Sequence, residues 1–243
     1  MRIIVTTCDQ YMSLIEGWTK LFNKYWGSQY KVELLGFDPP EFELPDNFTF
    51  HSAGKQNDFP VKAFYDPFEP IINSFPEDYF VLFGEDTFLI SNVDHDMLKK
   101  AEEKMHAGEA DSIFLFWGGP EQFRRTKKQD ANFLEFPQDM DYRVNVQPQI
   151  VSKNYFFKYM KPGMSVHDYE IENIKKARNN GATILCGKTP IAPWANIVRL
   201  GKFNPYLYEN LKKSNGKSFA WNEYQVFNEE DEELIRSYEN WTA

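Results

Sequence analysis

The stretch from Glu77 to Asp96 constrains the fold of this chain more than any other. The residues from Tyr79 to Phe83 are all apolar or aromatic, and the run stops at Gly84. A short continuous run of this kind predicts a strand buried on both faces, which is typical of the centre of an α/β sheet. Two carboxylates, Glu85 and Asp86, follow directly. They should lie at the carboxyl edge of the sheet, where they could hold a divalent cation against a diphosphate or hydrogen-bond a sugar.

A second interpretation of the same stretch stays open. Acidic residues are common in the turn between a strand and the next helix. In that case Glu85 and Asp86 are simply turn residues, and Asp94 or Asp96 caps the helix that follows. The spacing is compatible with both interpretations.

Apolar segments of strand length alternate with amphipathic segments along the chain. We expect strands at residues 2–7, 31–37, 48–51, 79–83, 112–117 and 182–186. Apolar spacings of three and four residues predict helices at 11–25 (closed by Gly27, with Asp9 as N-cap), 59–75, 94–108, 154–160 and 165–180. This alternation is typical of an α/β fold with a mostly parallel central sheet flanked by helices.

We find no internal repeat and no linker that separates independent domains, so we predict one α/β domain over residues 1–205. Residues 206–243 are then a C-terminal extension, and the acidic helix expected around Glu229 to Trp241 packs on the domain. The polar stretch 118–141 carries a cluster of Arg124, Arg125, Lys127 and Lys128. We interpret this stretch as a solvated loop or hairpin in preference to a phosphate clamp.

Composition disfavours several classes of function. The formal net charge of -9 argues against a nucleic-acid backbone as partner, although a bound metal or a few local cations could still attract a phosphorylated ligand. No run approaches the ~20 apolar residues of a membrane span. The two cysteines, Cys8 and Cys186, lie in apolar strand-like segments and are expected to be buried thiols in a reducing compartment. We therefore expect a soluble, cytoplasmic protein.

A second group of acids lies in the helix predicted after Ser165. Ser165 and Asp168 have the spacing of a capping box. Asp168 and Glu172 share a helix face, whereas Glu170 points away from them. If the helix begins near the carboxyl edge of the sheet, one of these carboxylates could face the first acidic pair across a cleft and deprotonate an acceptor hydroxyl. Alternatively, they are only acids favoured by the helix dipole.

Other signatures of function are absent from the sequence. There is no GxGxxG after the first strand and no GxxxxGK[ST], which disfavours dinucleotide and P-loop sites. There is no GxSxG nucleophile elbow, and the four histidines do not form a zinc pattern. The two acidic groups are therefore the main candidates for chemistry.

Four segments, taken together, resemble a known family. In chain order they are IIVTTCDQYMSLIEGWTKLFNKYWG, DYFVLFGEDTFLI, NVQPQIVSKNYF and HDYEIE at the start of a helix. This ordered set, spread over roughly residues 1–205, resembles bacterial and phage glycosyltransferases of the A-type fold. Members of that family are single α/β domains that use nucleotide-sugar donors. The resemblance therefore implies a nucleotide-diphospho-sugar transferase-like fold and transfer of a hexose-type sugar to a carbohydrate or other hydroxyl acceptor.

The resemblance also implies roles for particular residues. It places the turn Thr7-Cys8-Asp9 near the nucleotide base. It places Gly84-Glu85-Asp86, which differs from a full Asp-x-Asp, against the donor sugar or a Mn²⁺ or Mg²⁺ ion. It places Gln147-Pro148 on the acceptor side. The Trp-x-x-Glu pattern of the family maps onto residues 169–172, with Tyr169 in place of Trp and Glu172 as the acid.

The working hypothesis gives every candidate residue a role. The residues expected to line the nucleotide pocket are Thr7, Asp9, Tyr11, Asp58 and Lys62. Glu85 and Asp86 hold the sugar or the metal ion at the diphosphate. The acceptor proton is taken by Glu172 or, failing that, by Asp168 or Glu170. The residues expected on the acceptor side are Gln147, His167 and Tyr169.

Two rival functions stay open at this point. A nucleotidyltransferase of related fold also needs metal-holding acids at a strand end, but it usually brings a glycine-rich basic loop, and none is visible. A non-catalytic carbohydrate-binding or assembly protein with a degenerate transferase fold would explain the incomplete acidic motif and the many aromatic residues.

Overall fold

In the computed structural model, residues 1–243 are described except for 61–62, 64, 117–124, 200, 205–228 and 243. The described strands form one nine-stranded sheet and two small two-stranded sheets. The order in the large sheet is β3 (Phe48–Ser52), β2 (Val32–Gly36), β1 (Arg2–Thr6), β4 (Tyr79–Gly84), β9 (Gln149–Ser152), β6 (Ser112–Phe114), β10 (Ile184–Gly187), β8 (Phe133–Glu135) and β7 (Lys127–Lys128).

The large sheet is mixed, with most strands running the same way. Strands β3, β2, β1 and β4 pair in parallel. Strand β9 is antiparallel to both β4 and β6, so β6 and its parallel neighbour β10 run in the same direction as β4. Strands β8 and β7 form an antiparallel hairpin at the edge, as predicted for the described part of the charged stretch. The predicted α/β architecture is confirmed.

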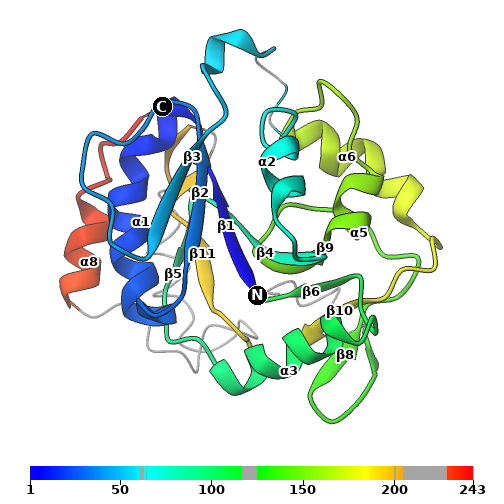
Figure 1. The fold of residues 1–243 in the computed structure, drawn as a ribbon. Coiled ribbons are helices and arrows are strands. Elements are labelled where there is room, and N and C mark those ends of the chain that lie inside the picture. The colour runs from blue at the N-terminus through cyan, green and yellow to red at the C-terminus, as the bar shows by residue number, and fades with distance from the viewer. Residues whose placement is uncertain (61–62, 64, 117–124, 200, 205–228, 243) are drawn as a thin grey trace.

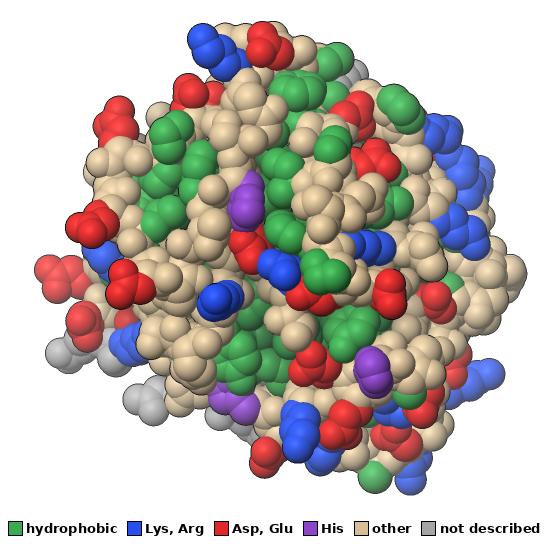
Figure 2. Space-filling view, viewed as in Figure 1, with side chains coloured by type: hydrophobic (Ala, Val, Ile, Leu, Met, Phe, Trp, Pro, Cys, Tyr) green, Lys and Arg blue, Asp and Glu red, His purple; other side chains and the backbone are tan. Residues whose placement is uncertain are grey.

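Helices cover both faces of the sheet (Figure 1). Successive strand residues point to opposite faces, so Ile3 and Val5 join one core cluster while Ile4 joins the other. The elements that bury residues in the first cluster are α1 (Ile15–Phe22), α3 (His95–His106) and α8 (Glu229–Arg236). Those that bury residues in the second are α2 (Glu69–Ser74), α5 (Lys153–Lys158) and α6 (Val166–Ala177). Figure 2 shows acidic and basic side chains mixed over one face of the molecule.

The first helical segment changes type twice. It begins as a 3₁₀-helix, η1 (Asp9–Leu14), continues as α1, and ends as a π-helix, η2 (Asn23–Gly27). Gly27 has φ +111°, a conformation that favours glycine, and the predicted end is confirmed. The prediction that Asp9 caps this segment is wrong. Cys8 occupies the N-cap, and the Asp9 carboxylate accepts the backbone N–H of Asp38 at 3.1 Å instead.

Two other caps agree with the sequence. Asp94 accepts the N–H of Met97 at 3.0 Å and caps α3, and Ser165 with Asp168 forms the capping box of α6. Of the helix predicted over residues 59–75, the described residues form only α2, which starts at Glu69 with Pro70 in its first turn. Proline fits the first helical turn but disrupts a helix interior, so the prolines limit this helix to its last part.

The C-terminal helix α8 packs on α1. Ile235 is fully buried, and the Asp231 carboxylate accepts hydrogen bonds from Lys24 (2.5 Å) and Tyr25. Beyond α8, Thr242 bridges to Lys202 in the short strand β13 (Lys202–Phe203), which pairs with β12 (Val198–Arg199). The end of the described chain is therefore tied back to residues near the carboxyl edge of the sheet.

The cysteines differ in burial. Cys186 is buried, whereas Cys8 is partly exposed at the end of β1, and neither forms a disulfide. The expectation of a buried thiol is confirmed for Cys186 only. Across the described residues, no helix is both long and apolar enough to cross a membrane.

Candidate active site

The carboxyl ends of β1 and β4 lie side by side. In the parallel register Thr6 is opposite Gly84, so the turn after Thr6 and the turn after Gly84 leave the sheet at the same level. Thr7 is buried, and its N–H donates to the Leu35 carbonyl at 2.9 Å. The two motifs that the sequence placed at this edge are therefore neighbours.

Asp86 is held by a strand that the sequence did not reveal. The short strand β11 (Trp194–Asn196) pairs antiparallel with β5 (Thr87–Leu89), and Asn196 lies opposite Thr87. The Asn196 amide donates to Asp86 Oδ2 at 2.9 Å, and the N–H of Ile197 donates to the Asp86 carbonyl at 2.8 Å. The last strand predicted from the sequence is 182–186, and β11 was missed because a three-residue strand gives too short a pattern to recognise.

The two adjacent acids lie in an environment that disfavours their charged forms. Glu85 is 8% exposed, and burial raises its pKa, with a further rise from the neighbouring charge of Asp86. Burial also raises the pKa of Asp86, against the lowering effect of the Asn196 hydrogen bond. The Cys8 thiol shares this environment: burial first, and then Glu85, raise its pKa to about 11. Cys8 is therefore protonated near neutral pH and is a poor nucleophile.

Glu170 on α6 is the acid that approaches this pair. Its charge is one of the causes that raise the pKa of Asp86. Its Oε1 accepts the N–H of Val146 at 3.1 Å. Val146 lies just before β9, which is antiparallel to β4, so this loop belongs to the carboxyl edge of the sheet. Burial raises the pKa of Glu170 as well.

The other two acids of this helix lie elsewhere. Glu172 is exposed, with Oε2 at 3.5 Å from the Lys161 amine and 3.8 Å from the Lys176 amine. Asp168 accepts the Ser165 hydroxyl at 2.7 Å within the capping box. The sequence correctly placed Glu170 on a different face from these two, but the structure turns the face of Glu170, not that of Glu172, toward Asp86.

Tyr65 completes the described surroundings of the acids. It is 2% exposed, and burial raises its pKa, followed by the charges of Glu85, Glu170 and Asp86. Its ring packs edge-on against Phe156 with the ring centroids 5.0 Å apart. Tyr65 lies in a segment rich in aromatic residues and prolines, where no periodicity marks it as a site residue, so the sequence analysis did not find it.

The residues expected at the nucleotide pocket surround the end of β1. Tyr11 is half-buried, and its pKa is raised by burial and then by Glu85. Asp9 is exposed, and its N–H donates to the Gln56 side chain at 2.9 Å. Gln56 and the exposed Asp58 belong to the 3₁₀ turn η3 (Gln56–Asp58), so this turn lies beside the same edge. Lys62 lies outside the described residues.

The residues expected on the acceptor side are not alike in position. Gln147 is half-buried in the loop before β9, with its N–H donating to Asn145 Oδ1 at 2.9 Å. His167 is exposed on α6, and its charge lowers the pKa of Glu170. Tyr169 is 1% exposed, and its hydroxyl donates to the Phe156 carbonyl at 3.0 Å. Tyr169 is therefore a core residue that anchors α6, and its hydroxyl is not turned toward an acceptor.

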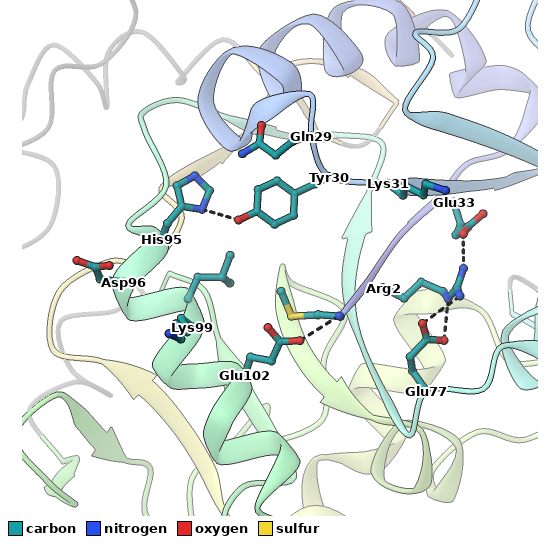
Figure 3. A pocket seen from close by; sticks show the side chains of 12 residues that line it. Arg2, Gln29, Tyr30, Lys31, Glu33, Glu77, His95, Asp96, Lys99 and Glu102 are labelled. Carbon is teal, nitrogen blue, oxygen red and sulfur yellow. Dashed lines mark hydrogen bonds and ion pairs between the residues drawn. The ribbon is translucent and has the colours of Figure 1, made fainter.

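A separate cavity of about 760 Å³ lies at the opposite, amino edge of the sheet (Figure 3). Its charges largely pair with one another. Arg2 donates to both oxygens of Glu77 at 2.9 and 3.0 Å and also contacts Glu33. The Tyr30 hydroxyl lies 3.2 Å from His95 Nδ1. The two acidic motifs of the sequence lie at the other edge, so we place the candidate site at the carboxyl edge.

Comparison with known proteins gives a fold and no family. No family model matches the chain, and no curated protein matches it. Among solved structures, the crystal structure of S. aureus TarS, a glycosyltransferase, has a TM-score of 0.50 and 11% sequence identity over 98% of this chain. A crystal structure of S. aureus TarS 1-349 has a TM-score of 0.48 and 13% identity, again over 98% of this chain and over 70% of that one. This chain spans 43% of the first structure. The likeness shows that this chain shares the α/β fold of TarS.

Proposed function

We propose that this chain is a glycosyltransferase that moves a sugar from a nucleoside-diphosphate donor to a hydroxyl acceptor. The observation that carries the proposal is the position of Glu85, Asp86 and Glu170 at the carboxyl edge of the sheet, where Glu85 and Asp86 follow β4 and Glu170 accepts the N–H of Val146 in the loop before β9. Among the described residues, no Lys or Arg forms an ion pair with any of the three. Glu85 is buried and Asp86 and Glu170 are half-buried, and carboxylates in such positions without a cation are unfavourable and gather at functional sites. The fold shared with TarS supports the same class of reaction.

For the donor, we propose that Glu85 and Asp86 hold Mn²⁺ or Mg²⁺ against the diphosphate. One or two carboxylates suffice for Mg²⁺, which takes its other ligands from water and substrate phosphates. Asn196 fixes Asp86 Oδ2, and a Cβ on Gly84 would lie 3.1 Å from Oδ1, so glycine keeps this oxygen uncrowded. When bound, the cation would supply positive charge for the leaving diphosphate.

For the acceptor, we propose Glu170 as the group that takes the hydroxyl proton. Its Oε1 is oriented by the Val146 N–H, which leaves Oε2 for the acceptor. Its raised pKa makes the ionised carboxylate a stronger base than that of an ordinary glutamate. Glu172 is too well exposed and too close to Lys161 and Lys176 to serve this purpose.

The test is a donor panel assayed for release of the nucleoside diphosphate. Wild type is incubated with UDP- and GDP-sugars, with and without Mn²⁺, and compared with Asp86→Asn, Glu170→Gln and the matched control Glu172→Gln. Asp86→Asn should lower turnover by about 100-fold or more, because it removes charge aimed at the leaving group. Glu170→Gln should lower transfer by a similar factor while nucleotide binding persists. Unchanged turnover in Asp86→Asn removes the proposed assignment, and binding without turnover in wild type favours a non-catalytic protein.

A further inference from the structure

The C-terminal segment (residues 229–242) reaches the candidate donor pocket through one aromatic contact. The rings of Tyr11 and Trp241 lie with their centroids 5.0 Å apart at an angle of 54°. Both side chains are half-buried, so each keeps part of its surface accessible. Tilted aromatic pairs at this distance are attractive and hold both rings in a defined orientation.

Trp241 is itself fixed by several groups. Its indole N–H donates to the Ser13 hydroxyl at 2.9 Å, and its backbone N–H donates to the Tyr238 carbonyl at 2.8 Å. Its carbonyl accepts the Phe203 N–H at 3.4 Å. The indole is therefore a rigid support, not a side chain that has settled loosely on the surface.

Tyr11 connects this support to the acids. Glu85 and Asp86 act electrostatically on its phenol group, and the backbone N–H of Gly201 hydrogen-bonds to it. The ring of Tyr11 therefore contacts Trp241 and belongs to the turn after β1, which leaves the sheet beside the turn that carries the acidic pair. A nucleoside diphosphate bound with its phosphates at Glu85 and Asp86 would pass beside this ring.

The rest of the segment is docked independently of Tyr11. The Tyr238 hydroxyl accepts the Gly17 N–H at 3.1 Å, and Ile235 is fully buried. Asp231 accepts hydrogen bonds from Lys24 and Tyr25 on the far part of the first helical segment. Loss of the Trp241 ring should therefore loosen Tyr11 without releasing α8.

We propose that Trp241 is a positioning residue of the donor site, which holds the Tyr11 ring against the nucleoside of a nucleoside-diphosphate donor. The C-terminal segment is then part of the binding pocket and not only an extension that covers the core. This inference rests on the proposed function, since it assumes that the carboxyl edge binds such a donor.

The experiment compares three variants of the full chain with wild type by calorimetric titration of UDP and GDP in the presence of Mn²⁺. Trp241→Leu keeps apolar bulk but removes the ring, and Trp241→Phe keeps a ring but loses the bond to Ser13. Tyr25→Phe is the matched control, because it removes one hydrogen bond that docks α8 and does not touch Tyr11. Thermal unfolding of each variant reports on the docking of the segment.

Trp241→Leu should weaken nucleoside-diphosphate binding about 3- to 10-fold, the range expected for one aromatic pair. Trp241→Phe should restore binding to within about twofold of wild type. Tyr25→Phe should lower the melting temperature but leave binding unchanged. In turnover, Trp241→Leu should raise KM with little change in kcat, as expected for loss of uniform binding.

Equal binding by wild type and Trp241→Leu overturns the role of Trp241 and leaves the proposed function standing. Equal weakening in Trp241→Leu and Tyr25→Phe also overturns it, because the effect then follows the docking of α8. If wild type binds neither nucleotide, this inference and the proposed function both fail.

Discussion

Replacement of Glu85 with glutamine tests the electrostatics on which the candidate site depends. Burial, and then the charge of Asp86, raise the pKa of Glu85 above its unfolded value. Between the two pKa values the native protein binds a proton that the unfolded chain has lost. The stability contributed by Glu85 is therefore fully present below the unfolded pKa of ~4.3 and is lost as the pH rises through the native pKa.

The loss of stability caused by charged Glu85 can be estimated from the shift of its pKa. Each pH unit between the two pKa values costs up to about 1.4 kcal/mol for one group. The site can relax and Glu85 can share a proton with Asp86, so we expect Glu85 to lower the free energy of unfolding of wild type by a total on the order of 2 kcal/mol at about pH 8. Glu85→Gln removes the charge with little change of shape, so the unliganded variant should melt about 4–8 °C higher than wild type at that pH. At about pH 4.5 the gain should nearly vanish, because native Glu85 is then protonated.

The assay is thermal unfolding of wild type, Glu85→Gln and Glu172→Gln at both pH values. Glu172 is an exposed acid near two lysines, so its replacement should change stability by less than about 0.5 kcal/mol at either pH. A Glu85→Gln variant that is no more stable than wild type at the higher pH would refute the reasoning. An equal gain at both pH values would refute it too, because the gain would then not come from the charge.

Three further perturbations follow from the same contacts. Arg2→Ala should lower the free energy of unfolding by roughly 1–3 kcal/mol near neutral pH, because Arg2 lowers the pKa of Glu77. This stabilisation is present above the unfolded pKa of Glu77 and is lost as the pH falls through the native pKa. Urea unfolding should therefore show a smaller loss of stability in acid. Asn196→Ala should weaken Mn²⁺-dependent UDP or GDP binding about 10-fold, because Asp86 loses the hydrogen-bond donor that orients it. Unchanged affinity in calorimetry would count against this role of Asn196. Trp18→Ala should cost about 3–5 kcal/mol in urea unfolding, because Trp18 is 1% exposed in the core, and a loss under about 1 kcal/mol would contradict that packing.

The sequence predicted those parts of the fold that depend on neighbouring residues. The apolar run before Gly84 forms the central strand β4, and the spacing from Ser165 to Asp168 forms a capping box. These features need only local periodicity or a short side-chain reach. The alternation of strands and helices predicted a mostly parallel sheet but not the order of its strands, and the antiparallel insertion of β9 between β4 and β6 was not anticipated.

The composition of the site depended on tertiary contacts that no local pattern carries. Periodicity separated Glu170 from Glu172, but only the packing of α6 on the sheet decides which of the two faces Asp86. Asn196 is distant in sequence from Asp86 and is brought to it by a three-residue strand. Tyr65 approaches the acids from a segment that was predicted as helix and is not part of one.

The most direct test of the whole account is calorimetric titration of UDP and GDP, with and without Mn²⁺, into wild type and two variants that change opposite edges of the sheet. Asp86→Asn changes the carboxyl edge, and Lys99→Ala changes the cavity at the amino edge. We predict that wild type and Lys99→Ala bind the same nucleotide with the same affinity and that Asp86→Asn loses binding. Binding that survives in Asp86→Asn and fails in Lys99→Ala would contradict the account, because the ligand would then occupy the opposite edge of the sheet.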